Sequence, residues 1–167
     1  SVFTFDDSQK EKLAAYDDSH WIIQDFIDGR EFNISILHGH AGPEVMPPAE
    51  MVFYNFDASR PKIVDFRAKW IEESFEYENT RRDFPGDKLS PVLAGRISDI
   101  ALQCWEVFGL KGYARVDMRV DNNHNPYVIE VNANPCMSPD SGLVAATMQA
   151  GIPITEVLKR IISDLNH

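Results

Sequence analysis

Two carboxylates, an amide and a guanidinium lie at alternate positions in the C-terminal half of this 167-residue chain: Arg115, Asp117, Glu130 and Asn132. They belong to two stretches rich in β-branched and aromatic residues, 113–120 and 126–132, with a polar turn between them. This pattern predicts a β-hairpin. If the loop holds four residues, a common hairpin length, Asp117 faces Glu130 and Arg115 faces Asn132.

The two faces of this hairpin are predicted to differ in character, because successive side chains of a strand point to opposite sides. One face carries the apolar residues expected in the core: Val116, Met118, Val120, Tyr127, Ile129 and Val131. The other face carries the charged and amide residues: Arg115, Asp117, Arg119, Glu130 and Asn132. The second face is therefore the candidate for chemistry.

Two facing carboxylates repel each other and destabilise a sheet, so keeping Asp117 opposite Glu130 makes physical sense if a cation lies between them. The donors on this face are hard oxygens, which favour Mg²⁺ or Mn²⁺ over zinc. Mg²⁺ commonly takes one or two carboxylates and fills its remaining positions with water and substrate phosphates. The alternative interpretation is a solvated polar face on which Arg115 and Arg119 neutralise the acids.

The residues after the hairpin favour the metal site. The motifs are Arg115-x-Asp117, Glu130-x-Asn132, Asn134-Pro135 and Met137-x-x-x-Ser141-Gly142. Together they resemble the C-terminal catalytic block of the ATP-grasp ligases, and within that superfamily they are most similar to the D-alanine–D-alanine ligase branch. The resemblance implies that Asp117, Glu130 and Asn132 hold Mg²⁺ ions across the nucleotide phosphates. It also implies that Arg115 contacts the transferred phosphoryl group.

The loop and helix that follow are implied to bind the second substrate. In the family, a serine at the position of Ser141 and the next backbone N–H bind the carboxylate of the incoming amino acid, and a helix is predicted to start here. This chain has Cys136-Met137-Ser138 where the family commonly has Gly-Met-Thr, and it has Gly142 in place of leucine. These departures touch the acceptor pocket and leave the acceptor open.

A second motif lies near the N-terminus. The stretches 21–27 and 31–37 read as strands joined by a turn at Asp28-Gly29. This predicted hairpin is similar to the adenosine-binding hairpin of ATP-grasp enzymes. The resemblance implies that Gln24 accepts from the adenine amino group, that the backbone of Ile27 meets the adenine ring, and that Glu31 holds the ribose hydroxyls. Taken alone, Glu31 would be a solvated residue at a hairpin end.

Lys69 precedes an aromatic residue at the end of a predicted strand, 62–70. It matches the position of a phosphate-contacting lysine in the D-alanine–D-alanine ligase group, and a compact ammonium suits that role. The alternative is an ordinary exposed lysine. The polar segment 71–87 that follows matches the mobile omega loop of the family.

The remaining elements are less specific. A short polar helix is expected within residues 1–20, a loop at 43–48, a strand at 49–53, and helices at 141–150 and 153–165. The clearest helix is 90–108, with Pro91 in its first turn, Gly109 at its end and an apolar stripe at helical spacing. The pair His38 and His40 has no evident third ligand, so no metal site is predicted there.

The composition is that of one globular domain, with 44% hydrophobic and 25% charged residues. A net charge of −10 argues against nucleic acid or an anionic membrane as a partner. No apolar segment is long enough to span a bilayer and no signal peptide is visible. Because the two cysteines make no disulfide framework, a cytoplasmic location is expected.

These observations predict an α+β fold over residues 1–167, an ATP-grasp C-terminal subdomain whose antiparallel sheet has helices packed on one face. The implied reaction is ADP-forming ligation of a small carboxylate to an amine through an acyl-phosphate, with ATP and Mg²⁺ (or Mn²⁺). The family's N-terminal substrate domain, second nucleotide-binding lysine and glycine-rich loop have no match, so the isolated chain is expected to be inactive. The alternatives are a non-catalytic nucleotide-binding remnant and a plain α+β interaction module.

Overall fold

The computed structural model describes residues 11, 16, 20, 23–58 and 60–165. The chain divides into two compact units. One unit comprises residues 28–52 and 81–167, and the other comprises residues 1–27 and 53–80. None of the described helices is long and apolar enough to cross a membrane.

The fold is built on one sheet with the strand order β4-β3-β1-β5-β6, and β2 also pairs with β1. The strands are β1 Gly29–Gly39, β2 Gly42–Val45, β3 Ala49–Phe53, β4 Thr80–Asp83, β5 Tyr113–Asp121 and β6 Pro126–Asn132. The pairings of β1 with β2, β3 and β5, and of β5 with β6, are antiparallel. The α+β class with an antiparallel sheet is therefore confirmed.

The β5–β6 hairpin forms where the sequence predicts it, with one irregularity. Arg115 faces Asn132 and Asp117 faces Glu130, as expected. A β-bulge then shifts the register between Asp117 and Met118, so that Arg119 faces Tyr127 rather than residue 128. One extra residue in β6 shifts the register on one side of the bulge and leaves the pairs of Arg115 and Asp117 unchanged.

The bulge corrects part of the predicted core. Because facing residues share a side of the sheet, Tyr127 lies on the polar face with Arg119, and Ile129 is the extra residue of the bulge. Tyr127 is 41% exposed and Ile129 is 48% exposed. The prediction that both residues lie in the core is therefore wrong. β6 is at the edge of the sheet, and Val131 is its residue that packs against the core.

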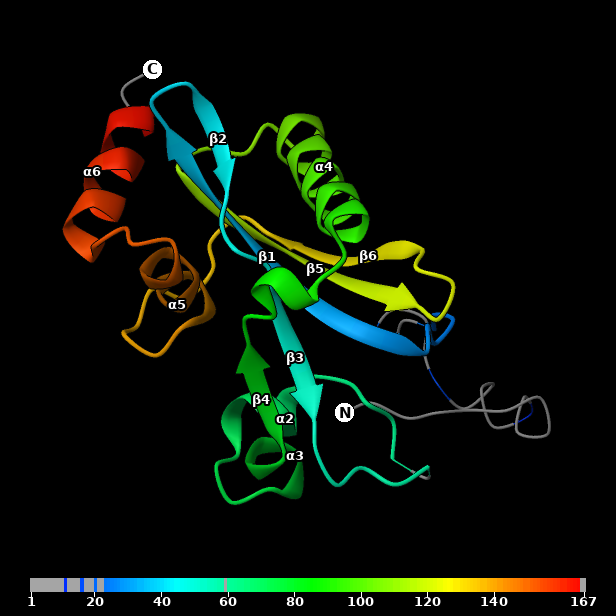
Figure 1. The fold of residues 1–167 in the computed structure, drawn as a ribbon. Helices are drawn as coiled ribbons and strands as arrows, with labels where there is room; N and C mark the ends of the chain where they lie inside the picture. Colours follow the sequence, from blue (N-terminus) through cyan, green and yellow to red (C-terminus); the bar gives the residue numbers. More distant parts are fainter. Residues whose placement is uncertain (1–10, 12–15, 17–19, 21–22, 59, 166–167) are drawn as a thin grey trace. The chain divides into compact units, whose positions relative to one another are not determined.

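The helix α4 (Pro91–Val107) covers the apolar face of β1 and β5 (Figure 1). It buries four side chains one turn apart: Leu93, Ile97, Ala101 and Trp105. They pack against seven apolar residues of the two strands: Phe32, Ile34, Ile36, Ala114, Val116, Met118 and Val120. Cys104 also packs against this cluster, as its place on the predicted stripe implies.

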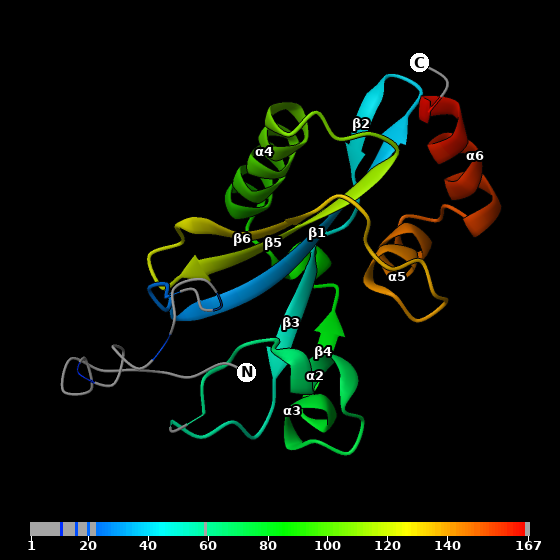
Figure 2. The ribbon, with the colours of Figure 1, turned by 180° about the vertical axis from the view of Figure 1, so that it is seen from behind.

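The C-terminal helices α5 (Gly142–Gln149) and α6 (Ile154–Leu165) pack near the end of β1 (Figure 2). They form a second apolar cluster around Leu37, Ala146 and Val157. Leu37 alternates with the core residues of β1 and so belongs to the opposite face from them. The Asp164 carboxylate accepts from the backbone N–H of Gly112, and its Oδ1 lies 3.2 Å from His38 Nδ1, which ties α6 to the sheet.

The segment before β1 departs from the prediction. Residues 23–28 have no regular secondary structure, and Ile23 is 69% exposed, so the predicted strand 21–27 is not found in its described part. An apolar run alone does not make a strand when no neighbouring strand pairs with it. The predicted loop 43–48 is confirmed at 46–48 and was wrong at 43–45, because β2 begins at Gly42 and pairs with the end of β1. Most of the helix predicted within residues 1–20 lies outside the described residues.

The predicted strand 62–70 is not found, because residues 62–65 have no regular secondary structure and the rest form a short helix. Residues Phe66–Trp70 form α2, and the Asp65 carboxylate accepts from Ala68 N at 2.9 Å, the bond of a helix N-cap. This local hydrogen bond outweighs the alternating pattern. The segment 71–87 contains the helix α3 (Phe75–Glu78, capped by Ser74), β4 and the 3₁₀ turn η2 (Gly86–Lys88).

Candidate active site

The polar face of the sheet carries three rows of facing residues across β1, β5 and β6. Asn33, Asp117 and Glu130 form the central row. Ser35, Arg115 and Asn132 form the row on one side, while Glu31 and Arg119 face each other on the other side. The hairpin register thus brings five of the predicted site residues onto one surface: Glu31, Arg115, Asp117, Glu130 and Asn132.

Arg115 and Asp117 form the central ion pair of this face. Arg115 donates from Nε to Asp117 Oδ1 at 2.6 Å and from Nη2 to Oδ2 at 2.8 Å. Asn33 Nδ2 donates to the same Oδ1 at 3.0 Å. Burial by itself would lower the pKa of Arg115, but the hydrogen bonds and charge of Asp117, helped by Glu130 and Glu31, raise it. Asp117 is only 7% exposed, so this pair compensates a buried carboxylate.

The oxygens on this face fit a hard divalent cation. Glu130 is exposed and forms no hydrogen bond or ion pair with a described residue, and Asn132 Oδ1 accepts from the backbone of Asn134 at 2.9 Å. Within the described residues, no group of three or more His, Cys, Asp and Glu side chains forms a metal cluster. Two carboxylates and one amide suit Mg²⁺, which needs few protein ligands when phosphates supply the others.

Glu31 is held by a nearly buried arginine. Arg119 is 4% exposed, and its Nη1 donates to Glu31 Oε2 at 2.9 Å while its Nη2 donates to the carbonyl of Gly29 at 3.1 Å. The Glu31 carboxylate is therefore fixed on the polar face. This arrangement differs from the solvated hairpin end that Glu31 would otherwise represent.

Ser141 lies where the predicted helix begins. It is the N-cap of α5, and its hydroxyl accepts from Val144 N at 3.4 Å. The residue is 8% exposed. Cys136, Ser138 and Asp140 form the loop before it, where the Ser138 hydroxyl donates to Asp140 Oδ1 at 2.6 Å. The pKa of Cys136 is lowered by its hydrogen bonds with Ser138.

Three predicted nucleotide contacts belong to the unit made of residues 1–27 and 53–80: Gln24, Ile27 and Lys69. Gln24 is exposed, and Ile27 is half-buried. Lys69 is exposed on α2 and forms no ion pair with a described side chain. Their roles stay predictions.

Two residues near the site were missed from the sequence. Asn33 bonds Asp117 from β1, and the alternation of Glu31, Asn33 and Ser35 already placed it on the polar side of its strand. Arg82 on β4 reaches the loop before α5, and Nη1 donates to the carbonyl of Asp140 at 3.3 Å. No local pattern predicts that contact, because it joins residues 58 positions apart.

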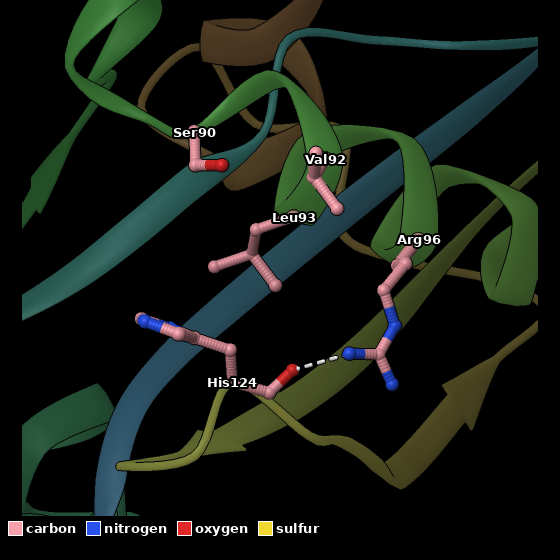
Figure 3. Close-up of a pocket in the computed structure, with 5 residues that line it drawn as sticks. All are labelled: Ser90, Val92, Leu93, Arg96 and His124. Carbon is pink, nitrogen blue, oxygen red and sulfur yellow. Dashed lines mark hydrogen bonds between the residues drawn. The ribbon is translucent and has the colours of Figure 1, made fainter.

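A small cavity of about 90 Å³ lies between the start of α4 and the β5–β6 turn (Figure 3). Its lining residues are Ser90, Val92, Leu93, Arg96 and His124. Arg96 Nη1 donates to the carbonyl of His124 at 2.8 Å, which fixes the turn against the helix. The cavity contains none of the predicted site residues.

Comparison with known proteins decides the family. The family model described as the D-ala D-ala ligase C-terminus matches residues 8–163, almost the whole chain. The chain belongs to this family. The ATP-grasp resemblance of the hairpin motifs is thereby confirmed.

Two similar relatives carry ligase names. The D-alanine–D-alanine ligase of Synechococcus sp. (strain JA-2-3B'a(2-13)) is 30% identical over 154 residues, covering 92% of this chain and 42% of the relative. The enzyme of the same name from Saccharophagus degradans is 30% identical over 153 residues, covering 92% of this chain and 43% of the relative.

The fold agrees with a solved member. The structure of D-alanine–D-alanine ligase from Bacillus anthracis complexed with ATP superposes with a TM-score of 0.65 at 26% identity, over 95% of this chain and 46% of that chain. The chain spans less than half the length of the relatives and structures that it matches.

Proposed function

We propose that this chain is the Mg·ATP-binding catalytic region of an ADP-forming carboxylate–amine ligase that resembles the D-alanine–D-alanine ligases. The observation that carries the proposal is the pairing of Asp117 with Glu130 beside Arg115 and Asn132, in a member of this family. Use of ATP as substrate favours a cytoplasmic location. The substrate domain that this family pairs with such a region is expected to come from outside residues 1–167.

Asp117, Glu130 and Asn132 are proposed to hold Mg²⁺. When bound, the ion would neutralise the phosphate oxygens between which the phosphoryl group is transferred. Facing carboxylates are costly without a cation, and this supports the assignment. Arg115 compensates the charge of Asp117, to which it donates at 2.6 and 2.8 Å.

Arg115 is proposed to leave Asp117 for the transferred phosphoryl group. Its guanidinium is partly buried and carries a raised pKa, so it stays charged through any working pH. A planar fork that already binds one carboxylate in two places suits the oxygens of a phosphoryl group. Phosphoryl transfer depends on such positioning and charge stabilisation rather than on covalent help from the protein.

The nucleotide is proposed to be held by residues carried over from the family. Glu31, fixed by Arg119, would accept from the ribose hydroxyls. Gln24 and the backbone of Ile27 would meet the adenine, and Lys69 would meet a phosphate. These assignments are supported by the resemblance of the sequence around each residue to the corresponding motif of the family.

The acceptor is proposed to be a small amine with a free carboxylate, bound by Ser141 and the N–H of Gly142. Ser141 caps α5, and free N–H groups at a helix start attract anions. A charge-assisted bond stabilises such a carboxylate by about 1.5–3 kcal/mol. Ser141→Ala should therefore raise the KM of the acceptor roughly tenfold or more while that of ATP stays unchanged.

Steady-state phosphate release tests this proposal in the complete protein encoded by the reading frame that contains this sequence. A panel of amino acids and their methyl esters serves as acceptors. Preference for the free acids that is lost in Ser141→Ala supports the proposal. Nucleotide binding without phosphate release on any acceptor would indicate a non-catalytic remnant, and absence of nucleotide binding would indicate a plain interaction module.

A further inference from the structure

The guanidinium of Arg82 lies at the start of α5, beside the proposed acceptor site. Its Nη1 donates to the Asp140 carbonyl at 3.3 Å. A Cβ atom placed on Gly142 would be 3.7 Å from Nη2, 3.9 Å from Nε and 4.0 Å from Cζ of the same arginine. The fork of Arg82 therefore faces the residue whose N–H is proposed to bind the acceptor.

Arg82 differs from Arg115 in how its charge is compensated. Arg115 is paired at both ends of its fork with Asp117. Arg82 forms no ion pair with a carboxylate of the described residues: it contacts Asp140 through the backbone carbonyl, and the Asp140 carboxylate accepts from the Ser138 hydroxyl. Burial lowers the pKa of Arg82, the Arg115 charge lowers it further, and Asp140 opposes both effects. Two guanidinium groups thus share one region, and an added anion would stabilise it.

Position 142 has no side chain beside the guanidinium of Arg82. A Cβ atom alone would make ordinary contacts with the guanidinium. A leucine, which the resembling ligases carry here, would extend further into the volume that the fork occupies. Gly142 and Arg82 thus act as a pair at one of the two places where the acceptor loop departs from the family pattern.

We propose that Arg82 is a specificity-determining residue that binds the carboxylate of the acceptor together with Ser141. This inference rests on the proposed function and names the group that recognises its second substrate. The matching ligand is an amino-acid-like amine whose planar carboxylate accepts two parallel N–H bonds from one guanidinium. Neutral esters and amides of the same amine lose that pairing.

The test compares Arg82→Ala, Arg82→Lys and Arg81→Ala in the complete protein. Arg81 is the control, because it is an exposed neighbour on β4 whose side chain points to the other side of the strand. Steady-state phosphate release is measured with amino acids and their methyl esters, and Mg·ADP affinity is measured by calorimetry. Arg82→Ala should raise the acceptor KM at least about tenfold, leave Mg·ADP affinity unchanged and remove most of the preference for acid over ester.

Arg82→Lys and a fourth variant, Gly142→Leu, separate recognition from folding. Arg82→Lys should recover only part of the lost affinity, because a point charge replaces the fork. Gly142→Leu should reproduce the Arg82→Ala defect, and the double variant should be no worse than either single one, because both changes remove the same interaction.

An acceptor KM that rises equally for acid and ester, or a matching defect in Arg81→Ala, would overturn the role of Arg82 and leave the proposed function standing. A wild-type protein that neither binds Mg·ADP nor releases phosphate would overturn the proposed function and this inference with it.

Discussion

At the scale of single residues, the polar face is a set of charges that compensate one another. Asp117 depends on Arg115 and Asn33 for its hydrogen bonds. Glu130 faces the same carboxylate from β6 and is exposed to solvent. The two acids proposed to hold one cation are therefore unequal, because Asp117 is buried and hydrogen-bonded whereas Glu130 is exposed.

Substitution of Asp117 and of Glu130 should affect the stability of the fold to different extents. Asp117→Asn leaves the partly buried Arg115 without its carboxylate and should cost about 1–3 kcal/mol of metal-free stability. Glu130→Gln should change stability by less than about 0.5 kcal/mol, because Glu130 is exposed and its loss relieves repulsion. Thermal unfolding without metal measures both. A large loss of melting temperature in Glu130→Gln would mean that this carboxylate is structural.

The two cysteines should react at different rates. Hydrogen bonds with Ser138 lower the pKa of the exposed Cys136, whereas burial raises the pKa of Cys104 on α4. The thiolate is the reactive form, so Cys136 should alkylate faster, and at lower pH, than Cys104. Mass spectrometry after brief iodoacetamide treatment measures the two sites, with Ser138→Ala as the variant that should slow Cys136. Equal labelling of both cysteines would contradict this.

At the scale of elements, the strongest sequence patterns proved sufficient. The long apolar stripe of α4 predicted a helix, the alternating runs of β5 and β6 predicted a hairpin, and both are found. The secondary structure of shorter segments depends on individual contacts that the hydrophobic pattern of the sequence does not reveal. Asp65 turned the end of a predicted strand into α2 through one capping bond, and the bulge after Asp117 moved Tyr127 onto the polar face.

The candidate site likewise contains residues that the sequence pattern predicts and residues that it does not. The carboxylates and amide of the β5–β6 hairpin follow from spacing, because facing positions in a hairpin are set by its loop. Asn33 and Arg82 come from β1 and β4, so their contacts with Asp117 and Asp140 depend on strand order and tertiary packing. A single sequence does not determine those features locally.

The β5–β6 turn should lose order in acid. Asp121 accepts from the backbone N–H groups of Asn123 and Asn125, at 2.9 and 2.8 Å, and these bonds hold its pKa below the ordinary value. A depressed folded-state pKa means that this contribution is complete above the unfolded pKa of about 3.9 and is lost as pH falls below it. Amide exchange of residues 122–125, compared between about pH 6 and about pH 3, measures the effect. Asp121→Asn should be insensitive to this change, and turn protection that is the same at both pH values in the wild type would contradict the account.

At the scale of the whole molecule, the net charge of −10 opposes the binding of any free nucleotide. Asp117 and Glu130 place two of these negative charges at the site itself, and Arg115 is already paired with Asp117. Nucleotide binding should therefore require the divalent cation that these acids are proposed to hold. The metal dependence of binding is thus a direct consequence of the proposed site.

Calorimetry of ADP binding at millimolar nucleotide, with and without Mg²⁺, tests the central claim most directly. The wild-type chain should bind Mg·ADP weakly and metal-free ADP not measurably, and Glu130→Gln should lose most of the metal-dependent heat while keeping its fold. Arg81→Ala serves as the control, because it removes a charge outside the proposed site. Heat of binding that is the same with and without Mg²⁺, or that survives Glu130→Gln unchanged, would contradict the assignment of the Asp117, Glu130 and Asn132 face as the metal–nucleotide site.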